Sequence, residues 1–241
     1  MRTFRPVIDD LPMEEIKRLL SWVGFLEPLS EDELEGLVGR AGFLRLGDGE
    51  ELILGPGQQG ESMLILVVGQ LQVYVVSPSE RELTLQVLGS GSVVGATGLA
   101  ARAVRDLRVR ALEPSLVCRV DRADLEALVT GNHESAIRLA KMLAEGLIVM
   151  EDRWADAAEK GVPARLAGLL LMLAEDEGVM TREGPVIPTR YTHQQLGSMI
   201  GSNREAVTRA FSKLQQGGGV ELRGRRVYVT YPDALRRAAG E

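Results

Sequence analysis

The sequence predicts an α+β chain: an N-terminal antiparallel β-roll of the jelly-roll kind, a long helix, and a C-terminal winged helix-turn-helix. Three observations predict this order. Short runs rich in Val, Leu and Ile, separated by glycine turns, occupy residues 42–120. Apolar residues then repeat at alternating steps of four and three along 134–158. Finally, two short helical segments joined by Gly201 precede a hairpin pattern that ends at Thr230.

Length and composition exclude several classes of protein. The 241 residues suffice for one large domain or two ordinary ones. The single cysteine excludes a disulfide framework, a four-thiolate zinc site and a cysteine-ligated iron–sulfur cluster. The longest apolar runs, Met63–Val68 and Leu169–Ala174, are far shorter than the roughly 20 residues that span a bilayer, and residues 1–15 contain no apolar signal core. We therefore expect a soluble, cytoplasmic protein with no membrane partner.

The net charge of −6 conceals an asymmetry along the chain. Residues 1–160 carry 17 basic and 26 acidic side chains, whereas residues 161–241 carry 11 and 8. Within 190–226, seven basic residues stand against two acidic ones. A basic segment joined to an acidic body indicates that one end meets a polyanion, or else that this segment has a solvated basic face.

The first 120 residues predict two short helices followed by strands. Leu11–Leu20 and Ser30–Ala41 have helical patterns, and Ser30 with Glu33 forms a capping box. Short strands about ten residues apart are typical of an antiparallel sandwich or roll. The predicted strands are Glu51–Leu54, Met63–Val68, Leu71–Val76, Leu83–Leu88, Leu107–Ala111 and Leu116–Val120.

One glycine segment imitates a dinucleotide-binding motif. Gly55–Gly60 fits G-x-G-x-x-G, but Met63–Val68 after it is a strand pattern. No helix N-terminus would then be available for a pyrophosphate, so we interpret the segment as a structural turn.

The middle of the chain predicts a short helix at Asp121–Val129 and a long one at Glu134–Ala158. The apolar repeat of the long helix has the spacing of a coiled-coil seam, which predicts a symmetric homodimer. The alternative is that this stripe packs on the helix's own β-domain. The residues of the seam are Ala136, Ala140, Leu143, Leu147, Met150, Trp154 and Ala157.

Gly161–Pro163 interrupts the helical pattern and predicts the last domain boundary. The predicted division is therefore 1–132 for the N-terminal helices and β-roll, 133–160 for the dimerisation helix, and 161–241 for the winged helix-turn-helix.

In the C-terminal part, Ala164–Glu175 and Thr192–Ile200 predict helices, and Gly201 ends the second. We expect Ser202 to cap the next helix, with Glu205 as its capping-box partner. Behind it, Val220–Leu222 and Val227–Thr230 form a hairpin, the wing, around a turn at 223–226.

The helix after Gly201 carries the residue types that read a DNA major groove. Arginine donates twice to guanine, and glutamate accepts from the cytosine amine. Arg204, Glu205 and Arg209 supply these groups near the start of the helix. The alternative is a surface helix on which Glu205 and Arg209 form an exposed pair. The predicted backbone contacts, which position the protein without specifying sequence, are Gln194, Ser202, Asn203, Thr208 and Arg225.

From about residue 20 onward the chain resembles the CRP/FNR family of bacterial transcription regulators. The most specific segments are Thr192–Arg209 and Glu221–Val229, and Gly161–Leu166 is similar to the family's hinge. The resemblance implies a homodimer on double-stranded DNA at a palindromic promoter site, and contact with RNA polymerase. It also implies that Arg204, Glu205 and Arg209 match the family's base-reading trio.

The ligand pocket departs from the family's cyclic-nucleotide pattern. Where the resemblance implies a glutamate for the ribose, Gly95 is followed by Ala96, and where it implies Ser or Thr after the phosphate-binding arginine, Arg105 is followed by Asp106. The side chain of Ala96 cannot accept a hydrogen bond from a ribose hydroxyl, and the carboxylate of Asp106 would repel a phosphate. We therefore expect no response to cAMP or cGMP.

Two interpretations of this pocket remain. Arg105 could bind a small anion, because the segment is also similar to cyanobacterial nitrogen-control regulators, which sense 2-oxoglutarate. Alternatively, Arg105 and Asp106 form a self-satisfied ion pair in a regulator without an effector.

Other chemistries are not expected. Cys118 lies on an apolar strand, which predicts a buried, inert thiol, and His133 and His193 are poor haem ligands. The sequence contains no metal-ligand spacing and no paired nucleophile and base, so we expect no metal, no cofactor and no enzyme activity. The competing hypothesis is a regulatory β-roll that binds a ligand or protein without specific DNA readout.

Overall fold

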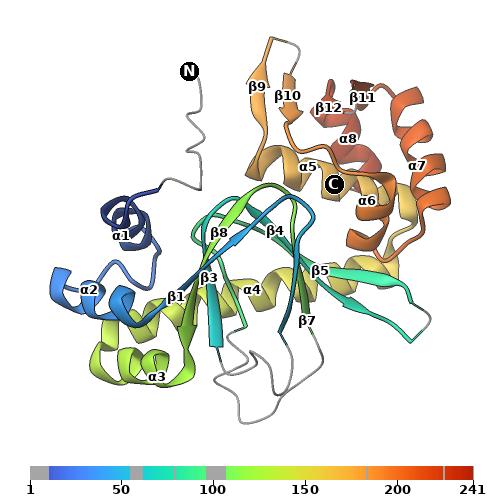
Figure 1. Cartoon of the computed structure of the whole chain (residues 1–241). Coiled ribbons are helices and arrows are strands. Elements are labelled where there is room, and N and C mark those ends of the chain that lie inside the picture. The colour runs from blue at the N-terminus through green and yellow to red at the C-terminus, as the bar shows by residue number, and fades with distance from the viewer. Residues whose placement is uncertain are drawn as a thin grey trace. The chain divides into compact units, whose positions relative to one another are not determined.

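A computed structural model describes residues 11–54, 62–78, 80–95, 107–182, 184–224 and 226–240 (Figure 1). The chain divides into two compact units. The first comprises Met1–Val76 and Leu85–Ile148, and the second comprises Ser77–Thr84 and Val149–Glu241. The predicted fold class is confirmed: an antiparallel β core, a long helix and a helix-turn-helix region follow one another along the chain.

The first unit begins with two amphipathic helices, α1 (Met13–Ser21) and α2 (Glu31–Arg40). The capping box predicted for α2 is confirmed. The backbone N–H of Glu33 donates to Ser30 Oγ at 3.3 Å, and the N–H of Ser30 donates to Glu33 Oε2 at 2.8 Å. The apolar side chains of both helices are buried against the β-roll.

Two four-stranded antiparallel sheets form the β-roll. One has the order β1-β8-β3-β6 and the other β2-β7-β4-β5. The strands are β1 (Gly42–Leu46), β2 (Glu51–Leu54), β3 (Ser62–Val68), β4 (Gln70–Val76), β5 (Glu82–Gly89), β6 (Val93–Val94), β7 (Leu107–Ala111) and β8 (Ser115–Asp121). All six strands expected from the sequence are present, while β1 and β6 were not predicted.

The strand β3 is buried on both faces, which explains its continuous apolar run. Leu64 and Leu66 point into the core between the two sheets. Met63 and Ile65 point the other way, into a core shared with the helices. Cys118 also lies in that second core, where burial raises the pKa of its thiol to about 12. The thiol is therefore protonated and unreactive at neutral pH, as the sequence predicted.

The outer face of the second sheet carries a polar cluster centred on Arg110. Its guanidinium donates to Glu51 at 2.7 Å and to the Tyr74 hydroxyl at 3.0 Å, and lies over the Tyr74 ring at 4.6 Å. The Tyr74 hydroxyl donates to the same Glu51 oxygen at 2.7 Å. Burial raises the pKa of Glu51, but these hydrogen bonds and the charges of Arg110 and Arg108 outweigh burial and lower it.

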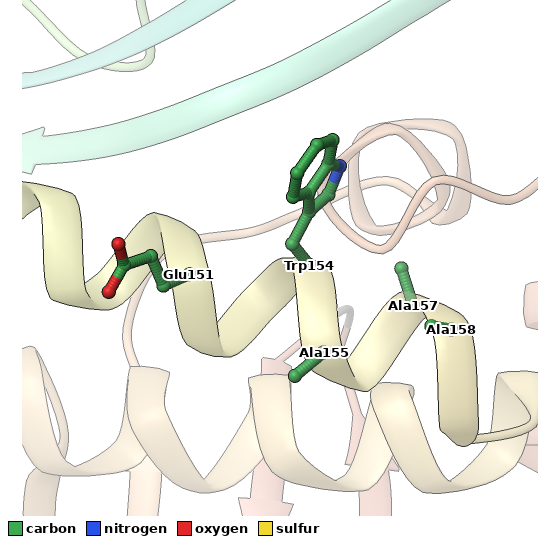
Figure 2. Close-up of a pocket in the computed structure, with 5 residues that line it drawn as sticks. All are labelled: Glu151, Trp154, Ala155, Ala157 and Ala158. Atoms are coloured by element: carbon green, nitrogen blue, oxygen red, sulfur yellow. The ribbon is translucent and has the colours of Figure 1, made fainter.

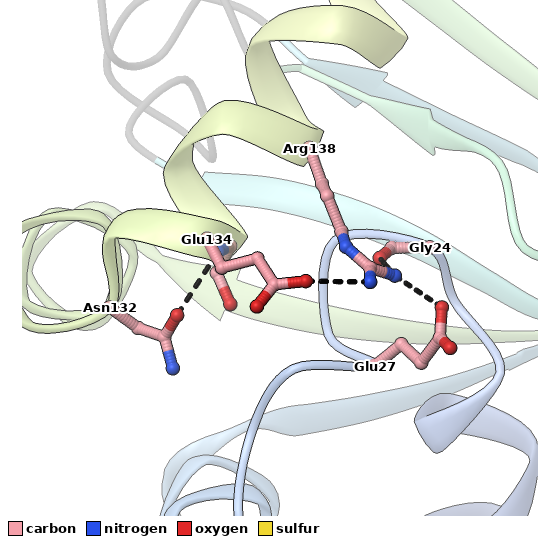
Figure 3. Close-up of polar contacts among 6 residues, drawn as sticks. Gly24, Glu27, Asn132, Glu134 and Arg138 are labelled. Atoms are coloured by element: carbon pink, nitrogen blue, oxygen red, sulfur yellow. Dashed lines mark hydrogen bonds and ion pairs between the residues drawn. The ribbon is translucent and has the colours of Figure 1, made fainter.

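The strands lead into α3 (Arg122–Gly131) and the 27-residue α4 (His133–Glu159). The first turns of α4 contribute Leu139 and Met142 to the core that β3 shares with the helices, called here the helix-covered core. Arg138 ties this end of α4 to the N-terminal segment: it pairs with Glu27, donates to Gly24 O at 3.3 Å and pairs with Glu134 at 2.7 Å (Figure 3).

The second unit contains a helical group and a small antiparallel sheet of order β11-β12-β10-β9. The strands β11 and β12 form the predicted wing hairpin. The helices and strands of the second unit that follow α4 are α5 (Val162–Asp176), β9 (Val179–Thr181), β10 (Gly184–Ile187), α6 (His193–Met199), α7 (Arg204–Gln216), β11 (Val220–Arg223), β12 (Arg226–Val229) and α8 (Pro232–Ala239).

An arginine on α5 caps the end of α4. Arg165 Nη1 donates to Lys160 O at 2.9 Å and to Ala157 O at 3.3 Å, which satisfies carbonyls that the last turn of a helix leaves without partners. Gly161 precedes α5 in an extended conformation, and Pro163 lies in its first turn, where its missing N–H costs nothing. None of the described helices is both long and apolar enough to cross a membrane.

Candidate nucleic-acid interface

The turn between α6 and α7 is fixed by backbone contacts. Thr192 and Gln195 form a capping box at the start of α6. Gly201 has φ +63°, a left-handed conformation that other residues rarely adopt, and the Ser202 N–H returns to Gly197 O at 2.8 Å. A side chain at Gly197 would lie 3.0 Å from Ser202 O, so a glycine allows this close approach. These contacts hold the two helices of the predicted helix-turn-helix together.

The start of α7 corrects one prediction. Asn203 is the N-cap: its Oδ1 accepts a hydrogen bond from the Ala206 N–H at 2.8 Å. Ser202 is not the cap, because its backbone is still bonded within the turn, and Glu205 is therefore the second helical residue, one position too early for a capping box. The capping box predicted between Ser202 and Glu205 is therefore not formed.

The proposed readers occupy the face of α7 that points away from the protein. The inner face of α7 is apolar and buried. Its residues share one side of the helix because they repeat at helical spacing: Val207, Ala210, Phe211 and Leu214. Arg204, Glu205 and Arg209 are all exposed. Among the described residues no ion pair joins Glu205 to Arg209, so the alternative of an exposed pair has no support in the structure.

Thr208 is bound within the helix-turn-helix. Its hydroxyl donates to Arg204 O at 2.9 Å and lies 2.8 Å from Nδ1 of His193 on α6. The His193 ring stacks on Phe211, with centroids 5.5 Å apart. Nothing in the sequence pointed to this link, because the two residues are fifteen positions apart and belong to different helices.

The remaining candidates for backbone contacts differ in their surroundings. Gln194 and Asn203 are exposed, and Ser202 is partly buried. Arg225 lies outside the described residues. Its neighbour Arg223 pairs with Glu221 at 2.6 Å and lies 5.1 Å from the centre of the Tyr228 ring, so its charge is partly offset.

The predicted seam on α4 is exposed. Leu143, Leu147, Met150 and Trp154 are 43%, 57%, 46% and 84% exposed. The α4 residues that pack against the helix-covered core are different ones, Leu139 and Met142. The alternative, that the seam packs on the helix's own β-domain, is therefore wrong for Leu143 and Leu147, which belong to the same compact unit as the β-roll.

Two further apolar side chains of α4 are exposed away from the seam, on the stripe that also carries Lys141. Ile137 and Ile148, which the heptad pattern did not include, are exposed by 57% and 56%. A recess of about 510 Å³ lies on the C-terminal half of α4, and Figure 2 shows Trp154 standing out from the helix beside it. The recess is lined by Glu151, Trp154, Ala155, Ala157 and Ala158.

The candidate effector pocket is described at one residue. Gly95 has φ +84°, and a side chain there would lie 2.9 Å from Ser62 O, so this turn requires glycine. Ala96, Arg105 and Asp106 lie outside the described residues, as does the glycine segment 55–60. Within the described ranges, no group of three or more His, Cys, Asp or Glu side chains could hold a metal ion.

Comparison with known sequences gives two family matches. The family model of the cyclic nucleotide-binding domain matches residues 47–132, and that of the Crp-like helix-turn-helix domain matches residues 164–238. The CRP-like cAMP-activated global transcriptional regulator of Mycobacterium tuberculosis (strain H37Rv) is 24% identical over 189 residues, 78% of this chain and 84% of that protein. The global nitrogen regulator of Synechocystis sp. (strain PCC 6803) is 25% identical over 190 residues, 78% of this chain and 84% of the relative.

Solved structures have the same fold. A CRP-family transcriptional regulator from Thermus thermophilus matches with a TM-score of 0.70 and 25% identity, covering 82% of this chain and 97% of its own. A CooA mutant from Carboxydothermus hydrogenoformans matches with a TM-score of 0.74 and 19% identity, covering 91% and 97%.

Proposed function

This chain belongs to the CRP/FNR family of transcription regulators, and we propose that it acts as a homodimer that reads a two-fold symmetric promoter site through α7. The observation that carries the proposal is the pair of faces on this helix. Its inner face is apolar and buried, and its outer face presents Arg204, Glu205 and Arg209 next to the turn. In a helix-turn-helix, residues near the start of the second helix contact base edges in the major groove.

The readers and the positioning residues have separate roles. Arg204 and Arg209 donate to guanine edges, and Glu205 accepts from a cytosine amine. Exposure of all three on one helix supports this assignment. Contacts to the DNA backbone, which fix the register, come from Gln194, Ser202, Asn203 and Arg225. The Thr208 hydroxyl, which the sequence also suggested for this role, gives its only proton to Arg204 O and would have to break that bond to donate to a phosphate.

The dimer forms through α4. Leu143, Leu147, Met150 and Trp154 are apolar, exposed and spaced as a coiled-coil seam, and water contact with such a face is unfavourable. Two copies joined along 136–157 would present two α7 helices to successive major grooves, about 34 Å apart. In this proposal residues 1–132 form the effector domain, 133–160 the dimerisation helix and 161–241 the DNA-binding domain.

The effector, if one acts, is not cAMP. Relatives of this chain include regulators named as cAMP-activated, but Ala96 and Asp106 replace the groups that would hold the ribose and the phosphate. A small anion bound by Arg105 and a regulator without an effector remain the two candidates. A bound anion would act by changing how the two α4 helices pack, and thus the spacing of the readers.

The proposed partners follow from this role. Promoter-bound dimers recruit or block RNA polymerase, and the protein works in the cytoplasm without catalysing a reaction. The family's non-enzymatic members support the last point.

Selection from random duplex DNA by the purified, ligand-free protein, read by sequencing, tests the proposal. Enrichment of a two-fold symmetric motif supports a dimeric regulator that is active without an effector. The same selection with candidate dicarboxylates and with cAMP distinguishes the effector hypotheses. If no symmetric motif is enriched under any of these conditions, a β-roll that binds a ligand or protein without DNA readout becomes the better description.

A further inference from the structure

The side chain of His193 is held against α7 by two contacts. Its Nδ1 lies 2.8 Å from Thr208 Oγ1, and its ring stacks on Phe211 with an interplanar angle of 20°. Phe211 is fully buried, so it gives the imidazole a fixed support. Both contacts come from the helix that carries the proposed base readers.

The hydrogen bonds determine which ring nitrogen carries the proton. Arg204 O is a carbonyl and can only accept, so the single hydroxyl proton of Thr208 points to it. His193 Nδ1 must then donate its proton to a lone pair of Thr208 Oγ1. In the neutral ring Nε2 is therefore the bare acceptor. A second proton added at Nε2 breaks neither contact.

The surroundings oppose that second proton in the free protein. Burial lowers the pKa of His193, and the positive charge of Arg204 lowers it further. Arg204 is the charged group that faces the ring from α7, the helix packed on α6. The sequence of α6 contains no other titratable side chain. His193 is therefore mainly neutral near pH 7.

Duplex DNA reverses this balance, because its phosphates offset the charge of Arg204 and offer acceptors to an N–H donor. We infer that DNA binding adds one proton from solvent to Nε2 of His193, which then donates a hydrogen bond to a backbone phosphate. The affinity of the protein for DNA consequently rises as the pH falls. This inference rests on the proposed function, because it requires a duplex lying against α7.

Asparagine at position 193 separates the two roles of the histidine. The amide NH₂ of His193→Asn can still donate to Thr208 Oγ1, but it cannot titrate. The chain has one other histidine, His133, at the start of α4 in the first unit. His133→Asn is therefore a matched control that removes one imidazole far along the chain from the helix-turn-helix.

The experiment measures Kd of the full-length protein for a selected symmetric duplex between about pH 6 and about pH 8. We expect Kd to increase with pH, about ten-fold for each unit by which DNA raises the pKa of His193. His133→Asn should keep this dependence and His193→Asn should lose it. In parallel, NMR of the histidine-labelled wild-type protein should show a higher pKa for His193 in the complex than in the free protein, and this measurement does not depend on the folding of a variant.

A pH dependence that persists in His193→Asn overturns the inference, and so does a His193 pKa that DNA leaves unchanged. Tight, sequence-specific binding in either case keeps the proposed function intact. If no symmetric duplex is bound at any pH, both the inference and the proposed function fail.

Discussion

The side-chain oxygen of Asn203 accepts a hydrogen bond from the Ala206 N–H at 2.8 Å, and this contact determines where the reading helix begins. Loss of an N-cap costs about 1 kcal/mol of stability. We expect Asn203→Ala to destabilise the full-length protein by that amount in urea or thermal unfolding, and Asn203→Asp to retain most of it. Ser202→Ala is the matched control. An equal loss in Ser202→Ala would show that the cap is shared between the two residues.

Removal of a base reader should change sequence preference as well as affinity. Arg204→Ala and Arg209→Ala each remove the donors that we propose for one guanine, and the loss of such a base contact costs ~1–3 kcal/mol. We expect the selected motif to become degenerate at one symmetric pair of positions in each variant. Lys213→Ala, at the far end of α7, serves as the control and should leave the motif unchanged. Intact motifs in both reader variants would remove this assignment.

The wing should contribute affinity without specificity. Arg225→Ala removes one cation that we propose contacts the DNA backbone. Binding should therefore weaken to a similar extent for matched and unmatched duplexes, and the slope of log K against log salt should flatten by about one. Titrations at several salt concentrations measure both quantities. Arg236→Ala on α8 removes a cation that is paired with Asp233, and it should alter neither. A loss confined to the cognate duplex would instead make Arg225 a base reader.

A charge in the seam should separate the protomers. Trp154→Glu places a carboxylate on the proposed interface, where its desolvation would not be compensated. We expect sedimentation velocity to show a monomer, with weaker binding to the symmetric site. Lys141→Glu introduces the same side chain on the opposite, exposed face of α4 and should remain dimeric. A dimeric Trp154→Glu protein would exclude this seam.

The cluster around Glu51 should make stability depend on pH. The pKa of Glu51 is lower in the folded protein than its ordinary value of 4.5, so its stabilising effect is complete above 4.5 and disappears as the pH falls through the folded-state pKa. Glu51→Gln should therefore lower the free energy of unfolding at about pH 7 and have a smaller effect below about pH 4. Urea denaturation at both values measures this. Glu145→Gln, an exposed carboxyl on α4, is the comparison, and a difference independent of pH would contradict the electrostatic cause.

The sequence predicted those elements whose signals are local. The capping box of Ser30 and Glu33, the strand Glu51–Leu54 and the long amphipathic helix were all recognisable because the residues that define them are close in the chain. The strand β1 escaped prediction because its Gly42–Leu46 segment contains glycine and arginine and is only partly buried. The two residues of β6 are too few to form a pattern.

The candidate site was predictable in its residue types but not in its contacts. Arg204 and Arg209 could be proposed as readers from their residue types, their position after Gly201 and the basic wing that follows. The Ser202 cap was wrong because its N–H bonds to Gly197 in the previous helix, a contact that depends on how the turn folds back. The bond between His193 and Thr208 likewise exists only once α6 and α7 are packed together.

The contact of Arg165 with the last carbonyls of α4 has a consequence for the junction between α4 and α5. Because the cap comes from α5, fraying of the final turn of α4 must break two hydrogen bonds to α5 and is disfavoured while α5 keeps its position. Unwinding at one helix end is thereby energetically coupled to movement of the next helix. Amide hydrogen exchange in residues 157–165 and cleavage by proteases near Gly161 should accordingly rise and fall together, and both would report whether α5 remains docked on the end of α4.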